Sequence, residues 1–125
     1  MASLAKIFFD RHLEYLAQND LDGMVNDSYH ENAILYNAFP IYADLPPWNV
    51  TRGRKDILRL FKDYLDFQGV INVEKVYNYF EDGNVISFQA VINSPKSGRW
   101  AAGDIWFMDE DFKMILRHYG FAHKL

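Results

Sequence analysis

The 125-residue sequence contains no cysteine, so it offers no disulfide framework, no thiolate nucleophile and no cysteine-based metal site. Basic residues are in the minority: 13 Lys and Arg stand against 17 Asp and Glu, which gives a net charge of −4. A protein that binds a phosphate backbone carries a basic face or stripe. We therefore expect no nucleic-acid partner.

Long apolar runs are missing as well. No stretch approaches the roughly 20 residues that are needed to cross a bilayer. Residues 1–16 mix charged and apolar residues at helical spacing, and they lack the uninterrupted apolar core of a secretory signal. We expect a soluble, cytoplasmic protein with no membrane partner.

The sequence also lacks the common cofactor motifs. No glycine-rich loop joins a strand to a helix, which argues against a site for nucleotide phosphates. The histidines at positions 12, 30, 118 and 123 do not show a ligand spacing such as His-x-x-x-His. We expect no metal ion and no cofactor.

Aromatic residues, by contrast, are abundant. Ten Phe, eight Tyr and three Trp make up 17% of a chain whose length suits one domain spanning residues 1–125. This is more ring surface than a small core usually requires. The surplus indicates a lined cavity, a subunit interface, or both.

Three early segments have apolar residues at helical spacing: residues 4–18, 21–29 and 53–68. Asp20 suits the N-cap of the second helix, and Gly69 suits the end of the third. The middle of the apolar face of the first helix falls on His12. This imidazole is expected to point to the interior, either as a satisfied core residue or as a functional one.

The remaining sequence predicts strands. Residues 33–37 form a short strand, residues 70–94 form a hairpin around Asp82 and Gly83 with Glu81 opposite Asn84, and residues 99–108 and 113–121 follow. Residues 38–52 hold three prolines and several aromatic residues, which is typical of a loop over a pocket mouth. Helices followed by antiparallel strands predict an α+β fold with the helices on one side of a curved sheet.

Asp104 interrupts an apolar strand, "RWAAGDIWFM". A buried carboxylate needs a hydrogen-bonded partner, a raised pKa or a function. A three-residue turn after this strand would place Asp104 opposite His118, whereas two or four residues would place it opposite Arg117. An Asp–His pair is able to move a proton near neutral pH, and an Asp–Arg pair is usually a static ion pair. Both partners remain open.

Three segments resemble the SnoaL-like branch of the nuclear transport factor 2-like superfamily. They are "YLAQNDLDGMVNDSYHENAILYN", the glycine-led helix "RGRKDILRLFKDYL" and the closing hairpin "GDIWFMDEDFKMILRHYGF". The resemblance implies a cone-shaped α+β roll, in which three N-terminal helices pack in a strongly curved, mainly antiparallel sheet. It also implies a pocket and a homodimer formed through the outer face of the sheet. The chain departs from the family at Phe112, where glycine usually precedes the lysine.

The same resemblance places Asp104 on the pocket face with a small, largely apolar organic ligand. Proteins of this family include isomerases, cyclases and dehydratases, as well as binding proteins without catalysis, so the fold alone does not fix a reaction. In the catalytic interpretation Asp104 with His118 or His12 supplies the base and the acid. The residues expected to touch the ligand are Tyr15, Tyr36, Phe39, Trp48, Tyr64, Trp106 and Arg117. In the alternative interpretation a non-catalytic module uses exposed Ile105 and Phe107 on the outer sheet face.

Overall fold

The computed structural model describes residues 1–39 and 48–125. Two helices open the chain, α1 (Leu4–Ala17) and α2 (Leu21–Ser28), and α3 (Arg54–Gln68) follows later. The strands are β1 (Tyr29–Ala38), β2 (Asn49–Arg52), β3 (Asn72–Asp82), β4 (Val85–Ser94), β5 (Gly98–Met108) and β6 (Ile115–Lys124). They form one sheet in the order β2-β1-β6-β5-β4-β3, in which β1 and β6 are parallel and all other neighbours antiparallel.

The helices begin and end at residues with clear capping roles. The N–H of Lys6 donates to Ser3 Oγ at 3.0 Å, and the N–H of Gly23 donates to Asp20 Oδ1 at 2.9 Å. Gly69 has φ of +80° and donates its N–H to the carbonyl of Leu65, which ends α3. The predicted cap at Asp20 and the predicted stop at Gly69 are confirmed.

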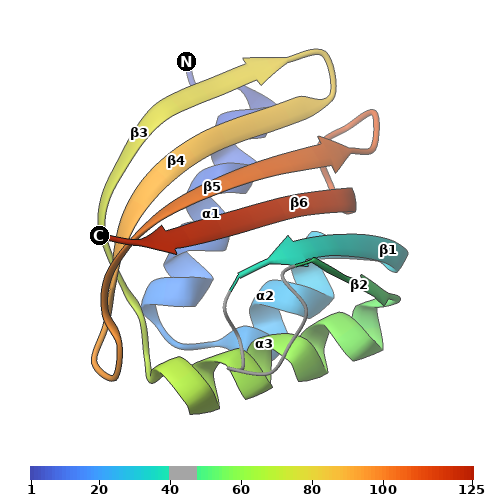
Figure 1. Cartoon of the computed structure of the whole chain (residues 1–125). Coiled ribbons are helices and arrows are strands. Elements are labelled where there is room, and N and C mark those ends of the chain that lie inside the picture. The colour runs from blue at the N-terminus through green and yellow to red at the C-terminus, as the bar shows by residue number, and fades with distance from the viewer. Residues whose placement is uncertain (40–47) are drawn as a thin grey trace.

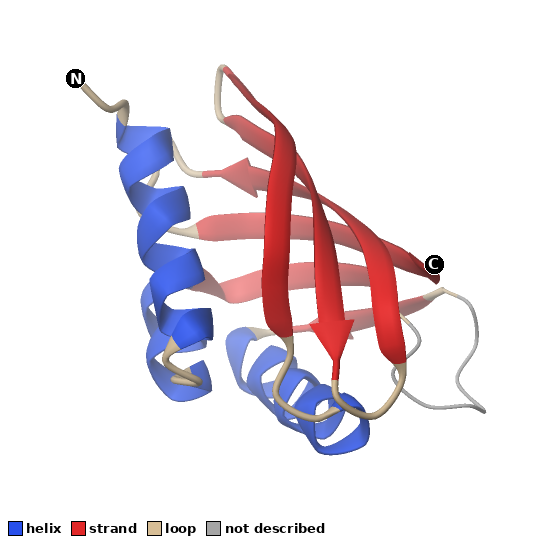
Figure 2. Cartoon of the chain, turned by 90° about the vertical axis from the view of Figure 1, so that its left-hand side faces the viewer, coloured by secondary structure: helices blue, strands red, loops and turns tan. Residues whose placement is uncertain are grey.

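The core lies between the helices and the inner face of the sheet. All three helices cover the same side of the sheet, whose longer strands curve around them (Figure 2). Among the fully buried side chains are Phe8, Phe9, Val25, Tyr29, Leu35, Ile57, Ile86, Trp106, Met108 and Ile115. The predicted three-helix α+β roll is therefore confirmed for the described residues.

Two details of strand pairing differ from the sequence-based expectation. The predicted register of the β3–β4 hairpin holds at its open end, where Val73 pairs with Ile92, but Glu81 pairs with Ile86 rather than with Asn84. Two register shifts lie between these pairs, and Asn78 has φ of +53° within the second shifted stretch. The short strand β2 falls inside residues 38–52, which were expected to be a loop; residues 40–47 lie outside the described residues.

The turn between β5 and β6 also differs from the expected lengths. It spans residues 109–114, Phe112 adopts φ of +53°, and the register shifts between Phe107 and Met108. Asp104 consequently pairs with Gly120, so the predictions that His118 or Arg117 lies directly opposite it are wrong. His118 instead pairs with Trp106, two residues along β5.

Candidate functional site

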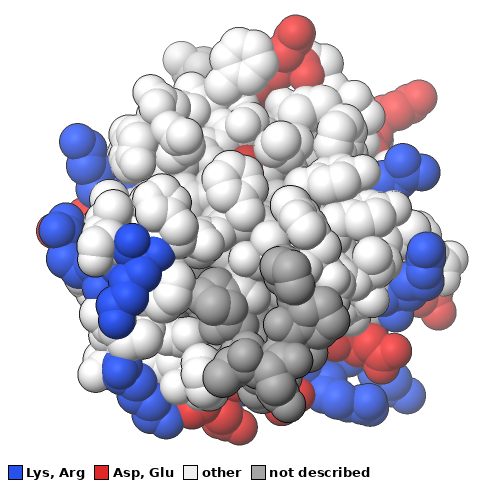
Figure 3. All heavy atoms as spheres, in the orientation of Figure 1, with Lys and Arg blue, Asp and Glu red and all other residues white. Residues whose placement is uncertain are grey.

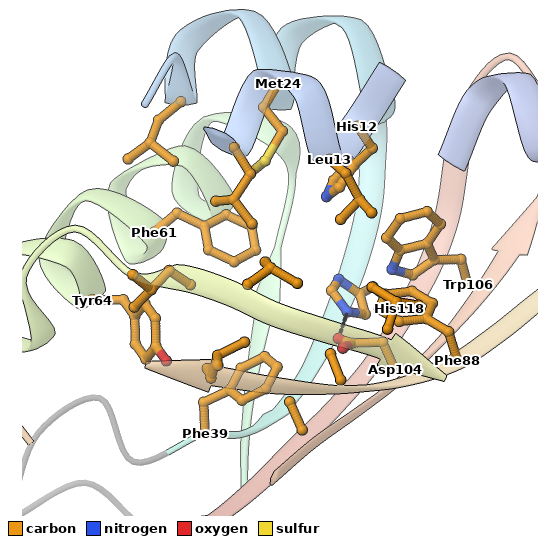
Figure 4. A pocket seen from close by; sticks show the side chains of 18 of the residues that line it. His12, Leu13, Met24, Phe39, Phe61, Tyr64, Phe88, Asp104, Trp106 and His118 are labelled. Carbon is orange, nitrogen blue, oxygen red and sulfur yellow. Dashed lines mark hydrogen bonds and ion pairs between the residues drawn. The ribbon is translucent and has the colours of Figure 1, made fainter. Parts of the chain in front are cut away.

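A cavity of about 100 Å³ lies between the helices and the inner face of the sheet (Figure 4). Apolar side chains from all three helices and from β3, β4 and β5 make up most of its wall. The polar groups that border it are the imidazoles of His12 and His118, the carboxylate of Asp104, the hydroxyls of Tyr29 and Tyr64, and the indole of Trp106. An apolar cavity with a few convergent polar groups is the usual form of a small-molecule site.

Asp104 and His118 form a largely buried pair at the sheet side of this cavity. Asp104 Oδ1 lies 2.6 Å from His118 Nε2, and the two side chains expose 11% and 5% of their surface. The pair is diagonal across β5 and β6, because Asp104 is opposite Gly120. A Cβ at residue 120 would lie 3.1 Å from Asp104 Oδ1 and 2.6 Å from the ring of Phe39. Gly120 thus leaves the space through which the carboxylate reaches His118.

Tyr29 completes a chain of hydrogen bonds behind this pair. Its hydroxyl lies 2.8 Å from His118 Nδ1 and is fully buried. Burial, and secondarily the charge of Asp104, raise the pKa of Tyr29 well above its usual value, so the hydroxyl keeps its proton. In a neutral His118 the hydroxyl therefore donates to Nδ1, and the Nε2 hydrogen is donated to Asp104. Tyr29 fixes the tautomer that points a donor at the carboxylate.

The second carboxylate oxygen of Asp104 is the free end of this chain. Within residues 1–39 and 48–125, Oδ1 has His118 as its partner and Oδ2 has no hydrogen-bond partner. Because Asp104 borders the cavity, Oδ2 is available to a bound molecule. A carboxylate with one oxygen hydrogen-bonded to the protein and the other open to a cavity has the arrangement of a general base.

His12 enters the same cavity from α1, as its position on the helix predicted. Its Nδ1 lies 3.3 Å from Ser28 Oγ, and its ring centroid lies 4.5 Å from that of Trp106. Burial, and to a lesser extent the charge of His118, lower the pKa of His12 to about 3. His12 is therefore neutral near neutral pH and acts there as a hydrogen-bonding group rather than as a cationic acid.

Three further residues from the sequence-based set lie on the cavity wall. Trp106 is 1% exposed, and Tyr64 is 8% exposed with its ring centroid 6.0 Å from that of Phe39. Burial, followed by the charge of Asp104, raises the pKa of Tyr64 to about 12. The Tyr64 hydroxyl therefore remains protonated and can donate to a ligand.

Four residues expected to touch the ligand lie outside the cavity wall. Tyr15 donates its hydroxyl to the carboxylate of Asp27, a hydrogen bond that raises the pKa of Tyr15. Tyr36 stacks on Tyr119 with centroids 4.5 Å apart, because strand alternation turns it to the outer face. Arg117, opposite Phe107, and Trp48 are exposed. Conversely, the sequence did not identify Tyr29 or Gly120 as part of this site.

An open groove of about 500 Å³ adjoins the cavity between α1 and the start of β3. The two spaces share Leu13, Leu16, Ile71, Val73 and Val76, and polar residues including Glu74 and Lys75 border the outer part of the groove. The groove therefore lies beside the cavity and shares an apolar wall with it.

The described residues contain no group of three or more His, Asp and Glu side chains placed to hold a metal ion. None of the described helices is long and apolar enough to cross a membrane.

Solved structures with this fold have little sequence similarity to the chain. An NTF2-like protein of unknown function from Burkholderia pseudomallei matches with a TM-score of 0.79 and 9% identity, over 98% of this chain and 92% of the other. A SnoaL-like protein of unknown function from Burkholderia thailandensis matches at 0.75 and 13%, over 99% and 98%. A candidate polyketide cyclase from Streptomyces antibioticus matches at 0.71 and 14%, over 94% and 91%.

No family model and no curated protein matches the sequence. The solved structures establish that the chain has the fold that nuclear transport factor 2-like and SnoaL-like proteins share, as the sequence resemblance implied. Sequence identities this low support a shared fold but not a shared activity, so an activity has to be inferred from the cavity itself.

Replacing Tyr29 with Phe should destabilise the protein by about 1–3 kcal/mol, because it leaves the buried Nδ1 of His118 without a donor. Tyr64→Phe is the matched control, since its hydroxyl has no hydrogen-bond partner in the described part of the chain, and it should cost clearly less. Urea unfolding compares the two variants. Nitrogen NMR of His118 should show a protonated Nε2 in the wild type; equal losses in both variants together with a protonated Nδ1 would contradict the assigned chain.

The low pKa of His12 should make stability fall with acidification. The residue is neutral when folded down to about pH 3 and takes up a proton on unfolding below its ordinary pKa of 6.5, so stability is lost as pH drops from 6.5 toward 3. At pH 5 this loss amounts to about 2 kcal/mol. Urea unfolding at pH 7 and pH 5 should show the loss in the wild type and in His123→Asn, an exposed control, and a smaller loss in His12→Asn. Identical pH dependence of stability in all three proteins would contradict the lowered pKa of His12.

Proposed function

We propose that the protein binds a small, largely apolar organic molecule with a carbonyl or hydroxyl group, and that Asp104 acts on it as a general base. The observation that carries the proposal is the open Oδ2 of Asp104 at the wall of an apolar cavity, with Oδ1 hydrogen-bonded to His118. Burial removes water that would compete for the carboxylate and strengthens its interaction with a ligand.

The chemistry begins with transfer of a proton from the carbon next to the carbonyl to Asp104 Oδ2. The C–H electron pair moves into the new carbon–carbon double bond, and the carbonyl oxygen takes up the negative charge of the enolate. His118 keeps its hydrogen bond to Oδ1 throughout, and Tyr29 keeps His118 in place. Return of the proton to another carbon gives isomerisation, and loss of a neighbouring hydroxyl gives dehydration. Attack of the enolate on a second carbonyl gives aldol cyclisation.

The cavity limits the size of the ligand group that it encloses. A cavity of about 150 Å³ holds benzene, so a space of about 100 Å³ suits a group no larger than a small ring. A longer molecule has to extend into the groove between α1 and β3, whose shared wall is apolar. The favoured ligand is therefore a compact carbonyl compound, or a carbonyl group at the end of a longer apolar chain.

The outer face of the sheet supports a second proposed property, association of two copies. Tyr36 stacks on Tyr119, Phe107 packs against the edge of Tyr119, and Phe107 and Phe121 expose 36% and 46% of their surface. Uncharged side chains occupy most of the middle of this face, with charged residues toward its rim (Figure 3). An apolar patch of this kind is typical of a subunit interface. The alternative function is that of an interaction module that uses this face alone. The cytoplasmic location stays a prediction.

Exchange of the ring protons next to the carbonyl of cyclopentanone for deuterium in D₂O tests the catalytic proposal. Proton NMR should show faster exchange with wild-type protein than in buffer, and Asp104→Asn should reduce the added rate at least about 100-fold. Asp111→Asn removes an exposed carboxylate and serves as the matched control, with exchange equal to the wild type. Equal exchange in all folded variants would refute the role of Asp104 and favour the interaction module.

A further inference from the structure

Trp106 carries a buried hydrogen-bond donor that has no acceptor among residues 1–39 and 48–125. In the described part of the chain its Nε1 exposes less than 1 Å² and has no hydrogen-bond partner. The other two tryptophans differ: Trp100 donates Nε1 to Ser97 Oγ at 2.8 Å, and Trp48 is 60% exposed to water. Leaving a buried donor unpaired costs about 1–3 kcal/mol. An unpaired buried donor requires an explanation, and a ligand bound in the adjoining cavity supplies one.

The position of the indole is fixed by tight packing. Its ring makes edge contacts with Phe8 and Phe88 at centroid distances of 5.8 and 5.1 Å, and it lies 5.9 Å from Phe9. Figure 4 shows its nitrogen-bearing edge turned toward His118 and the cavity rather than toward the surface. The N–H is therefore a preorganised donor whose direction cannot adjust to find a partner in the protein.

Trp106 and Asp104 border the same part of the cavity, because they are two residues apart on β5 and both face inward. Two residues of strand span about 7 Å, the reach of a small ring with an oxygen on it. The ring nearest to the indole is that of His12 at 4.5 Å, which is neutral near neutral pH, and the carboxylate of Asp104 repels anions. The surroundings therefore favour a neutral acceptor oxygen over a carboxylate or phosphate.

We propose that Trp106 Nε1 donates a hydrogen bond to the acceptor oxygen of the ligand and makes the cavity selective for neutral carbonyl compounds. This inference rests on the proposed function, because it places the carbonyl whose neighbouring proton Asp104 removes. The same donor stabilises the oxygen as it gains negative charge in the enolate. Since the nitrogen is covered in the free protein, the ligand oxygen reaches it by a small displacement of the surrounding side chains.

The test compares cyclopentanone with methylenecyclopentane, a hydrocarbon of similar shape without the oxygen. In ¹H–¹⁵N NMR spectra the Trp106 indole signal is identified by its loss in Trp106→Phe. Cyclopentanone should move this proton downfield while the Trp100 and Trp48 indole protons stay in place, and methylenecyclopentane should give no downfield shift. Affinities follow from the backbone amide shifts of residues around the cavity.

Trp106→Phe should weaken cyclopentanone binding about five- to thirtyfold and change methylenecyclopentane binding less than about threefold. Trp100→Phe makes the same chemical change on the same strand outside the cavity and should alter neither affinity. If cyclopentanone binds and exchanges its protons but the Trp106 indole shift does not distinguish the two probes, this inference is overturned and the proposed function stands. If neither probe binds, the proposed function fails and this inference falls with it.

Discussion

The diagonal hydrogen bond between Asp104 and His118 determines how the inner face of the sheet is organised. The carboxylate of Asp104 lies among apolar side chains, which is unfavourable unless the carboxylate accepts a hydrogen bond. Three features of the chain make the bond possible: the absence of a side chain at Gly120, the Tyr29 hydroxyl on the far nitrogen of His118, and a register that sets Trp106 opposite His118. Each comes from a different part of the sequence, so the polar end of the cavity forms only when the fold is complete.

The two faces of the sheet carry different kinds of side chain. Inward-facing residues of β5 and β6 supply the carboxylate, the imidazole and the indole, whereas outward-facing residues of the same strands supply exposed aromatic rings. Strand alternation explains why Tyr36 and Arg117 lie outside the cavity wall, whereas His118, next to Arg117, borders the cavity. Apolar residues on both faces of β5 therefore have two separate physical reasons, a cavity wall on one side and an uncovered aromatic surface on the other.

Local signals in the sequence were sufficient for the helices and for the inward direction of His12, whereas the inward direction of Asp104 came from the family resemblance. Capping at Asp20, the stop at Gly69 and helical periodicity depend on residues a few positions apart, which a single sequence displays. The strand registers depended on irregular backbone at Asn78 and Phe112. Asn adopts a positive φ more often than most residues, but nothing in the sequence distinguishes Asn78 from the other asparagines, and Phe rarely adopts such an angle. The role of Tyr29 required the parallel pairing of β1 with β6, a contact between distant segments that periodicity does not encode.

The proposed function requires that a carbonyl compound binds in the cavity beside Asp104 Oδ2. A crystal structure of the protein with cyclopentanone tests this most directly. We expect the ring in the cavity, with the carbon next to the carbonyl about 3–3.5 Å from Asp104 Oδ2 and the Asp104–His118 hydrogen bond retained. A ring bound elsewhere, or Oδ2 closed off by a hydrogen bond to another protein side chain while the ligand binds, would contradict it.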